Sequence, residues 1–185
     1  MASPLGHVAV ALALGVALRP ATPPRRYWVL GAGCSLVPDL DFLARSLGVH
    51  QLQVLLGGHR GLTHSVPFAV LLGLLVVLTS FASPGWRGRR GQLWLYFAAA
   101  TASHGLVDCL TAYGADVALL APISWVRVKA PWQPLGHGPC RGTLECLTQG
   151  LADEVLWLVL PALLVAGTIT WWRRRVGAPS RPAAA

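Results

Sequence analysis

Seven imidazole and carboxylate side chains lie in or beside the apolar segments of this sequence, where ionisable groups are costly and usually functional. They fall in four places: an isolated histidine near the N-terminus, "PDLD", "HRGLTHS" and "SHGLVD". The residues are His7, Asp39, Asp41, His59, His64, His104 and Asp108. Imidazole nitrogens with carboxylate oxygens suit zinc, and also manganese or iron in a dinuclear centre. The set therefore predicts a divalent metal site for one or two ions.

The spacing within these stretches fits metal ligation. His104 and Asp108 are four residues apart, so a helix would place them on the same face, about one turn from each other. Pro38 disfavours a regular helix before it, so Asp39 and Asp41 can each present oxygens from a loop. In "HRGLTHS", the glycine between the two histidines permits a turn that directs both toward one point.

The elements that must position these residues are apolar helices. Of 185 residues, 54% are hydrophobic and 12% are charged, whereas soluble domains carry roughly 25% charged residues. Several apolar runs approach the ~20 residues that cross a bilayer, and they are too long and too little alternating for barrel strands. We expect an all-α polytopic membrane bundle, one domain over 1–175 with a flexible tail over 176–185. Its five hydrophobic segments are predicted at roughly Pro4–Leu18, Tyr27–Ala44, Leu62–Ala82, Gln92–Thr111 and Asp153–Trp172.

The basic residues predict the orientation of this bundle. The loops after the first and third segments and the C-terminal tail hold ten of the fifteen Lys and Arg. The positive-inside rule then places the N-terminus outside and the C-terminus in the cytoplasm of an inner-membrane protein. With alternating segments, all four polar stretches fall on the outer face. The same short basic clusters do not form a groove with interleaved aromatic residues, which argues against nucleic-acid binding.

A long connection on the outer face is expected from Tyr113 to about Ala152. It carries Trp125 and Trp132, and it is predicted either to lie on the membrane surface or to fold over it as a lid. Cys140 and Cys146 lie in this loop and can form a disulfide if the loop is outside the cytoplasm.

Each polar stretch taken alone also has a structural explanation. His7 fits an interfacial polar residue, and His104 with Asp108 fits a buried hydrogen-bonded pair that joins two helices. The aspartates of "PDLD" fit a helix stop and N-cap, and the start of "HRGLTHS" fits side chains that face lipid headgroups. A metal site explains all four stretches at once, whereas the separate explanations require four coincidences on one face of the membrane.

The order of these motifs resembles a known family. A histidine that opens the first apolar segment, then "PDLD", "HRGLTHS" and "SHGLVDCLTAYG" followed by "LLAPIS", resembles the bacterial inner-membrane metal-dependent hydrolase family typified by YbcI and YdjM. The resemblance covers roughly residues 7–124, and that family is distantly similar to the zinc-dependent phospholipase C group. It implies that metal is bound by His7, Asp39, His59, His64, His104 and Asp108. It also implies that Asp41 binds metal or orients a ligand, and that Arg60 holds a phosphate, which a guanidinium matches with two hydrogen bonds.

These inferences predict a membrane-bound, metal-dependent hydrolase that acts on a lipid-like phosphoester at the outer face of the inner membrane. The expected catalytic residues are Asp41, as general base or orienting residue, and Arg60. The expected cofactor is zinc, with manganese or iron as alternatives, and the expected partner is membrane lipid. The alternatives are a metal or proton transporter and a non-catalytic scaffold with a structural metal. A transporter needs polar groups that continue toward the cytoplasm, and "VAVALALGVAL", "LLGLLVVLT" and "LWLVLPALLVAG" carry none.

Overall fold

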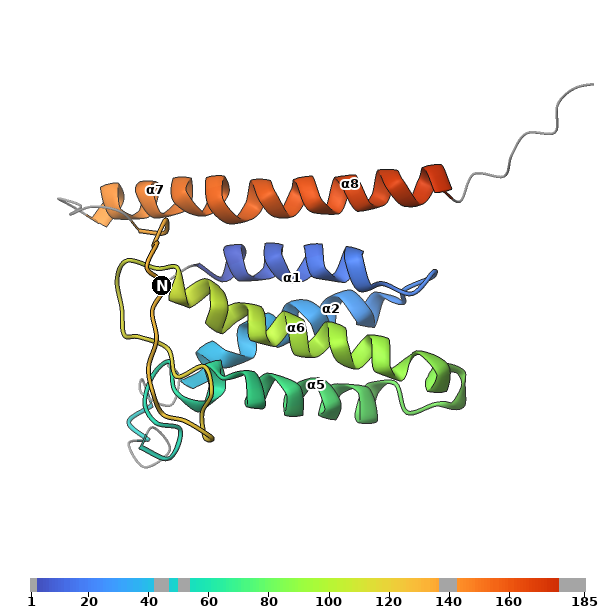
Figure 1. The fold of residues 1–185 in the computed structure, drawn as a ribbon, viewed down its shortest axis with the longest axis horizontal. Helices are drawn as coiled ribbons and strands as arrows, with labels where there is room; N and C mark the ends of the chain where they lie inside the picture. Colours follow the sequence, from blue (N-terminus) through green and yellow to red (C-terminus); the bar gives the residue numbers. More distant parts are fainter. Residues whose placement is uncertain (1–2, 42–46, 50–53, 137–142, 177–185) are drawn as a thin grey trace, which may run out of the picture.

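The computed structural model describes residues 3–41, 47–49, 54–136 and 143–176 (Figure 1). Within these ranges the chain is helical, has no β-strand and forms only two isolated β-bridges. The prediction of an all-α protein is confirmed. The α-helices are α1 (Pro4–Leu18), α2 (Arg25–Leu36), α5 (Val66–Ser80), α6 (Arg90–Cys109), α7 (Thr143–Glu154) and α8 (Leu160–Val176). The shorter elements are the 3-10 helices η1 (Val37–Asp39), η2 (Leu62–His64) and η3 (Pro84–Arg89) and the π-helical turn η4 (Val155–Val159).

Helix α6 is the centre of the bundle, because α1, α2 and α5 all pack against it. Its partners surround a buried aromatic cluster that includes Tyr27, Tyr96 and Phe97. A Cβ added at Gly73 of α5 would lie 2.7 Å from the backbone nitrogen of Ala98 in α6, so the two backbones are in contact at this point. Small residues allow helices to approach this closely in membrane bundles, where the hydrophobic effect does not drive the helices together.

The C-terminal helices α7 and α8 are joined through η4 into one long rod that lies along α1 (Figure 1). Glu154 in this rod accepts hydrogen bonds from the backbone nitrogen and hydroxyl of Ser3, just before α1 begins. A carboxylate at a helix N-terminus is favourable because the free backbone N–H groups carry positive partial charge. The rod is therefore attached to the bundle mainly through α1.

One helical stretch among the described residues, Thr148–Val176, has the length and hydropathy of a membrane span, and almost all of its apolar part is exposed. Helices α1 and α5 are shorter apolar helices. The stretch that is long enough is also the most peripheral, which fits a helix that faces lipid. The number of membrane spans, which the sequence predicts as five, stays a prediction.

Two predicted segments differ from the helices of the structure. Helix α2 ends at Leu36 and gives way to η1, because Pro38 interrupts the α-helical hydrogen bonding, and residues 42–46 lie outside the described part of the chain. The last helical rod begins at Thr143, not near Asp153, and so shortens the expected loop. Its first part is amphipathic and polar, so a search for apolar runs misses it. Cys140, the side chain of Cys146 and the tail 177–185 lie outside what the structure describes.

The bundle has two chemically different ends (Figure 1). The basic clusters lie at one end, where α1, α5 and α8 finish and α2 and α6 begin. There, Arg173 donates to the carbonyls of Val16 and Ala17 at 2.8 and 2.7 Å. An arginine of this basic end therefore also satisfies free backbone carbonyls at the C-terminus of α1. The opposite end, where α2 and α6 finish and α1 and α5 begin, carries the imidazoles and carboxylates; we call it the His/Asp end.

Candidate metal centre

Four elements bring the candidate ligands together at the His/Asp end. His7 lies in the first turns of α1, Asp39 ends η1, His64 ends η2, and His104 lies in α6 one turn before Asp108. Ser65 fixes the start of α5 by accepting a hydrogen bond from the Phe68 backbone at 3.2 Å, which is an N-cap. The turn that carries His64 is thereby held against the end of α6.

Gly105 allows this close approach of η2 to α6. A Cβ at this position would lie 2.2 Å from the carbonyl oxygen of His64, which is far inside van der Waals contact. With glycine there, the rings of His64 and His104 come to 4.8 Å between centroids, in an edge-to-face arrangement. The glycine next to His104 is thus required by the geometry of the site.

The ligand atoms of these residues converge. Nε2 of His104 lies 3.3 Å from Oδ1 of Asp39 and 3.8 Å from Oδ2 of Asp108. Nε2 of His64 lies 3.4 Å from Oδ2 of Asp108 and 3.8 Å from Oδ1 of Asp39. Nε2 of His7 lies 3.9 Å from Oδ1 of Asp108, and its ring stacks on that of His104 at 3.7 Å. One atom each from Asp39, His59 and His64 also lie within 4.8 Å of one another.

Four of these converging atoms are buried and make no hydrogen bond with any described residue. They are Nε2 of His7, His64 and His104 and Oδ1 of Asp39, whereas Oδ2 of Asp108 is ion-paired with Arg60. A buried polar group without a partner costs about 1–3 kcal/mol, and such groups are rare in folded proteins. Four in one place would consume much of the ~5–15 kcal/mol by which a domain is stable. A shared cation at their centre removes this cost.

The outward nitrogens of three imidazoles are already engaged, which fixes the ring orientations. Nδ1 of His104 donates to the carbonyl of Ser35 at 2.7 Å, and Nδ1 of His59 lies 2.8 Å from Oδ1 of Asp41. Nδ1 of His64 lies 3.1 Å from the hydroxyl of Thr63, which itself donates to Asp41. Metal-binding histidines are held in this way, with one nitrogen fixed by a backbone carbonyl or carboxylate and the other presented to the ion.

Arg60 lies behind the ligands, fully buried. Its Nε is 3.0 Å from Oδ2 of Asp108, and NH2 donates to Oδ1 of Asp108 and to the Thr111 hydroxyl, both at 3.1 Å. NH1 donates to the carbonyl of Ala115 at 2.7 Å. The guanidinium thus contacts a candidate ligand of the metal, and the phosphate contact expected from the resemblance stays a prediction.

The backbone at Arg60 is strained. Its φ of 62° is in the left-handed region, which a residue with a side chain adopts at a cost of about 1–3 kcal/mol. The strained conformation turns the side chain inward while the backbone nitrogen donates to Oδ2 of Asp41 at 3.2 Å. Asp41 is 3% exposed, and among the described residues its side chain accepts hydrogen bonds only from this turn, so it positions the turn and its histidines.

The charges around the centre favour a dication. Among the described side chains that contact the cluster, Asp39, Asp41 and Asp108 against the guanidinium of Arg60 leave two negative charges in excess when the imidazoles are neutral. Burial raises the pKa of Asp39, but the neighbouring imidazoles of His104 and His64 outweigh this effect and hold the pKa well below its ordinary value. Burial lowers the pKa of His64, yet Asp108 and Asp39 outweigh it and leave the pKa raised. Both shifts show that the cluster attracts positive charge.

The cluster reaches the surface along one edge. The side chains of Asp39 and His59 are 23% and 18% exposed, whereas those of Asp41, His64, His104 and Asp108 are 0–2% exposed. Structural metal sites are usually closed by protein ligands, and catalytic sites keep a position open to water or substrate. This arrangement has such an open edge.

All eight residues that the sequence nominates lie in or directly behind this cluster, and their roles as ligands or catalytic groups stay predictions. Sequence reasoning misses four contributors: the Ser35 carbonyl, the hydroxyls of Thr63 and Thr111, and Gly105. Thr63 and Gly105 each adjoin a candidate ligand, and a glycine beside a helical histidine was the available signal. The roles of Ser35 and Thr111 depend on tertiary contacts and leave no local signal.

Comparison with known proteins places the chain in a family. Residues 1–176 match the family described as YdjM inner membrane protein. The chain is 36% identical over 179 residues to the inner membrane protein YbcI of Escherichia coli (strain K12), which covers 95% of this chain and 100% of that protein. No solved structure matches. The chain belongs to the YdjM inner membrane protein family; both descriptions give a membrane location and name no reaction.

Proposed function

We propose that this member of the YdjM inner membrane protein family is a metal-dependent hydrolase that cleaves a phosphoester of a membrane lipid at the outer face of the inner membrane. The observation that carries the proposal is the set of four buried nitrogen and oxygen atoms without a hydrogen bond to any described residue, which converge with Asp108 from α1, η1, η2 and α6. A fold gains nothing from such atoms unless something binds them.

The residues that would hold one or two divalent ions are His7, Asp39, His59, His64, His104 and Asp108. A bound divalent ion supplies a water of lowered pKa and neutralises negative charge on phosphoryl oxygens. Asp41 and Arg60 are positioning residues in this proposal. Asp41 holds the rings of His59 and His64, and Arg60 holds Asp108.

The open edge at Asp39 and His59 supports a reactive site over a purely structural one. The neighbouring Leu40 is 54% exposed and places an apolar side chain next to these polar ones. This combination suits a substrate with both a polar and an apolar part. A phospholipid is the amphiphile that surrounds an inner-membrane protein, and its phosphate is an anion that a metal centre attracts.

The apolar interior supports a one-sided site over a transport path. Between His7 and the basic end, α1 packs on a buried cluster of side chains. The cluster includes Ala11, Tyr27, Phe97 and Leu93. The Thr101 hydroxyl in this part of α6 donates to the Phe97 carbonyl of its own helix. The described residues therefore give an ion no chain of ligands toward the basic end.

The test is metal content and turnover measured on the same purified, full-length samples. We expect one or two divalent ions per chain by elemental mass spectrometry, and release of a phosphorylated headgroup from vesicles of phosphatidylethanolamine and phosphatidylglycerol. Asp39→Asn removes the negative charge of a partly exposed candidate ligand at nearly constant volume. This variant should lose both the bound metal and the lipid turnover. Asp116→Asn is the matched control, since this exposed aspartate lies at the same end outside the cluster and should keep both.

The outcomes separate the three functional classes. Wild-type protein without bound metal would contradict the site itself. Stoichiometric metal that Asp39→Asn removes, with no turnover of either lipid, would favour a scaffold with a structural metal. Metal-dependent ion flux into sealed vesicles, abolished by His64→Ala, would favour a transporter.

A further inference from the structure

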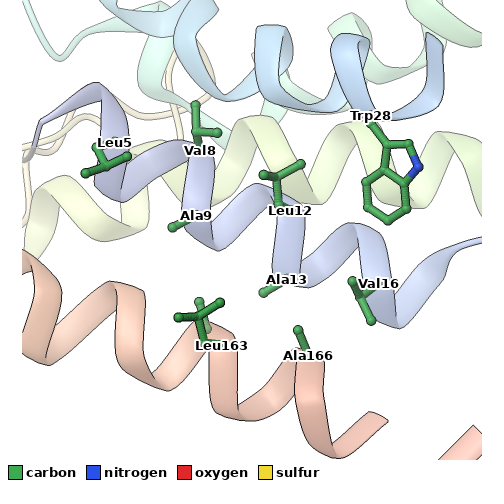
Figure 2. A pocket seen from close by; sticks show the side chains of 10 residues that line it. Leu5, Val8, Ala9, Leu12, Ala13, Val16, Trp28, Leu163 and Ala166 are labelled. Atoms are coloured by element: carbon green, nitrogen blue, oxygen red, sulfur yellow. The ribbon is translucent and has the colours of Figure 1, made fainter. Parts of the chain in front are cut away.

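An apolar groove of about 510 Å3 lies between α1 and α8 (Figure 2). Its lining has no charged side chain, and it comes from one face of α1, one face of α8 and a single residue of α2. The residues are Leu5, Val8, Ala9, Leu12, Ala13, Val16, Trp28, Ala162, Leu163 and Ala166. Its volume is in the range of ~300–1,000 Å3 typical of ligand sites.

Small side chains create the groove. Ala9 and Ala13 of α1 face α8, and Ala166 of α8 faces back (Figure 2). Ala162, one turn before Ala166, also lines the groove. Such pairs usually allow two helices to pack backbone against backbone. Here α1 and α8 are in contact along part of their length. The small side chains leave a hollow beside that contact, which is open to the surface of the bundle.

The surroundings of the groove identify its occupant as hydrocarbon. It is bounded by α8, part of the stretch Thr148–Val176 that has the length and hydropathy of a membrane span and is almost entirely exposed. In an inner-membrane protein the exposed face of this stretch meets lipid tails, not water. A groove open to that face and lined only by apolar side chains fills with the same tails.

The length of the groove matches one leaflet. From Leu5 to Val16 the α1 axis rises about 16 Å, at ~1.5 Å per residue. This is about half of the ~30 Å hydrocarbon thickness of a bilayer. Trp28 lies near the Val16 end of the groove (Figure 2), so an aromatic ring marks its inner limit.

The groove also ends at the His/Asp end. Leu5 and Val8 flank His7 in the first turns of α1, with His7 turned toward His104 on α6. We propose that the α1–α8 groove holds one acyl chain of an outer-leaflet phospholipid, with its headgroup beside the metal centre. That this lipid is the substrate rests on the proposed function; that an acyl chain occupies the groove does not.

The first test locates lipid tails on the unmodified protein. Full-length protein is placed in bilayer nanodiscs of phosphatidylethanolamine and phosphatidylglycerol that contain a phospholipid with a photoreactive diazirine in its acyl chain. After photolysis, peptide mass spectrometry should find adducts concentrated on Leu12, Val16 and Leu163. Leu71 and Leu164 are 65% and 70% exposed and do not line the groove, so they report non-selective contact with lipid.

Adducts distributed in proportion to exposure, with no excess in the groove, would overturn the proposal. Absence of groove adducts in protein that native mass spectrometry finds as a dimer would overturn it in favour of a second copy as occupant. Adducts in the groove without any lipid turnover would uphold lipid binding while the proposed hydrolase fails. Turnover without groove adducts would leave the hydrolase standing and overturn the groove.

The second test fills the groove from either side. Ala13→Leu and Ala166→Leu place added volume on opposite walls, so a folding defect in one leaves the other to report. We expect each to reduce the lipid that remains bound in native mass spectrometry at least tenfold, with unchanged metal content. Leu164→Phe is the matched control outside the groove and should retain wild-type lipid. Equal lipid retention in all three variants would contradict the proposal.

Discussion

The buried pair of Arg60 and Asp108 offers a quantitative test of the structure. The pair is 0% exposed on both sides, with Nε 3.0 Å from Oδ2 and NH2 donating to Oδ1 at 3.1 Å. Removal of one partner from a buried pair costs about 3–5 kcal/mol, because the other charge stays buried and uncompensated. Arg60→Met and Asp108→Asn should each therefore destabilise the protein by about 3–5 kcal/mol.

The double variant distinguishes a specific pair from two separate contributions. With both charges removed, no uncompensated charge remains, so the double variant should be more stable than the sum of the single effects predicts. We expect a coupling of about 2–3 kcal/mol, near the upper limit for directly interacting residues. The free energy of unfolding is measured by denaturant titration in mixed micelles with a chelator present, so that lost metal binding does not contribute.

Arg127 provides the matched control for this cycle. It also donates to carbonyls near the site, those of Gly57, His59 and Asp116, but its side chain is exposed. Water replaces these bonds when the side chain is removed, so Arg127→Ala should cost about 1 kcal/mol or less. A loss in Arg60→Met as small as that of Arg127→Ala, or additivity of the cycle within about 0.5 kcal/mol, would refute the reasoning.

Three further predictions follow from the same geometry. Gly105→Ala should abolish metal binding, since its Cβ would lie 2.2 Å from a carbonyl of η2, while Gly91→Ala in the same helix meets nothing within 4 Å and should keep wild-type metal content. Thr63→Val removes a hydroxyl that bonds to a carboxylate and an imidazole of the cluster, and should weaken metal affinity about 10–100-fold in a competition titration without removing a ligand. In a cysteine-free background, Asp116→Cys should react with a membrane-impermeant maleimide on intact cells and Gly85→Cys should not; the reverse pattern would invert the proposed orientation.

The sequence could predict the part of the site that depends on local residue spacing and on the alternating direction of successive apolar segments. The i, i+4 relation of His104 and Asp108 and the alternating direction of apolar segments are enough to bring four polar stretches to one end. The bounds of α1 are also predicted, because a proline near its start and an arginine after its end delimit one apolar run.

The rest depends on contacts that no local pattern encodes. The expectation for Arg60 came from the family resemblance and from the chemistry of a guanidinium. Its inward direction follows from a positive φ and from hydrogen bonds to residues 51 and 55 positions away. The polar first part of the rod at α7 is helical without an apolar run, and hydropathy detects only its continuation. Sequence thus predicts which residues meet, and the tertiary structure determines which of them face the centre and which support it.

The distribution of energetic costs argues that the His/Asp end is where the protein acts. A left-handed Arg60 costs about 1–3 kcal/mol, and a buried ion pair adds little net stability over an apolar replacement. Four buried atoms without a hydrogen bond to any described residue add a larger cost in the same place. The basic end carries no comparable cost among the described residues, since its arginines satisfy helix carbonyls and stack on aromatic rings. A bundle needed only as a membrane scaffold gains stability by losing these features. They all surround one point, and a cation held there, as we propose, would offset their cost.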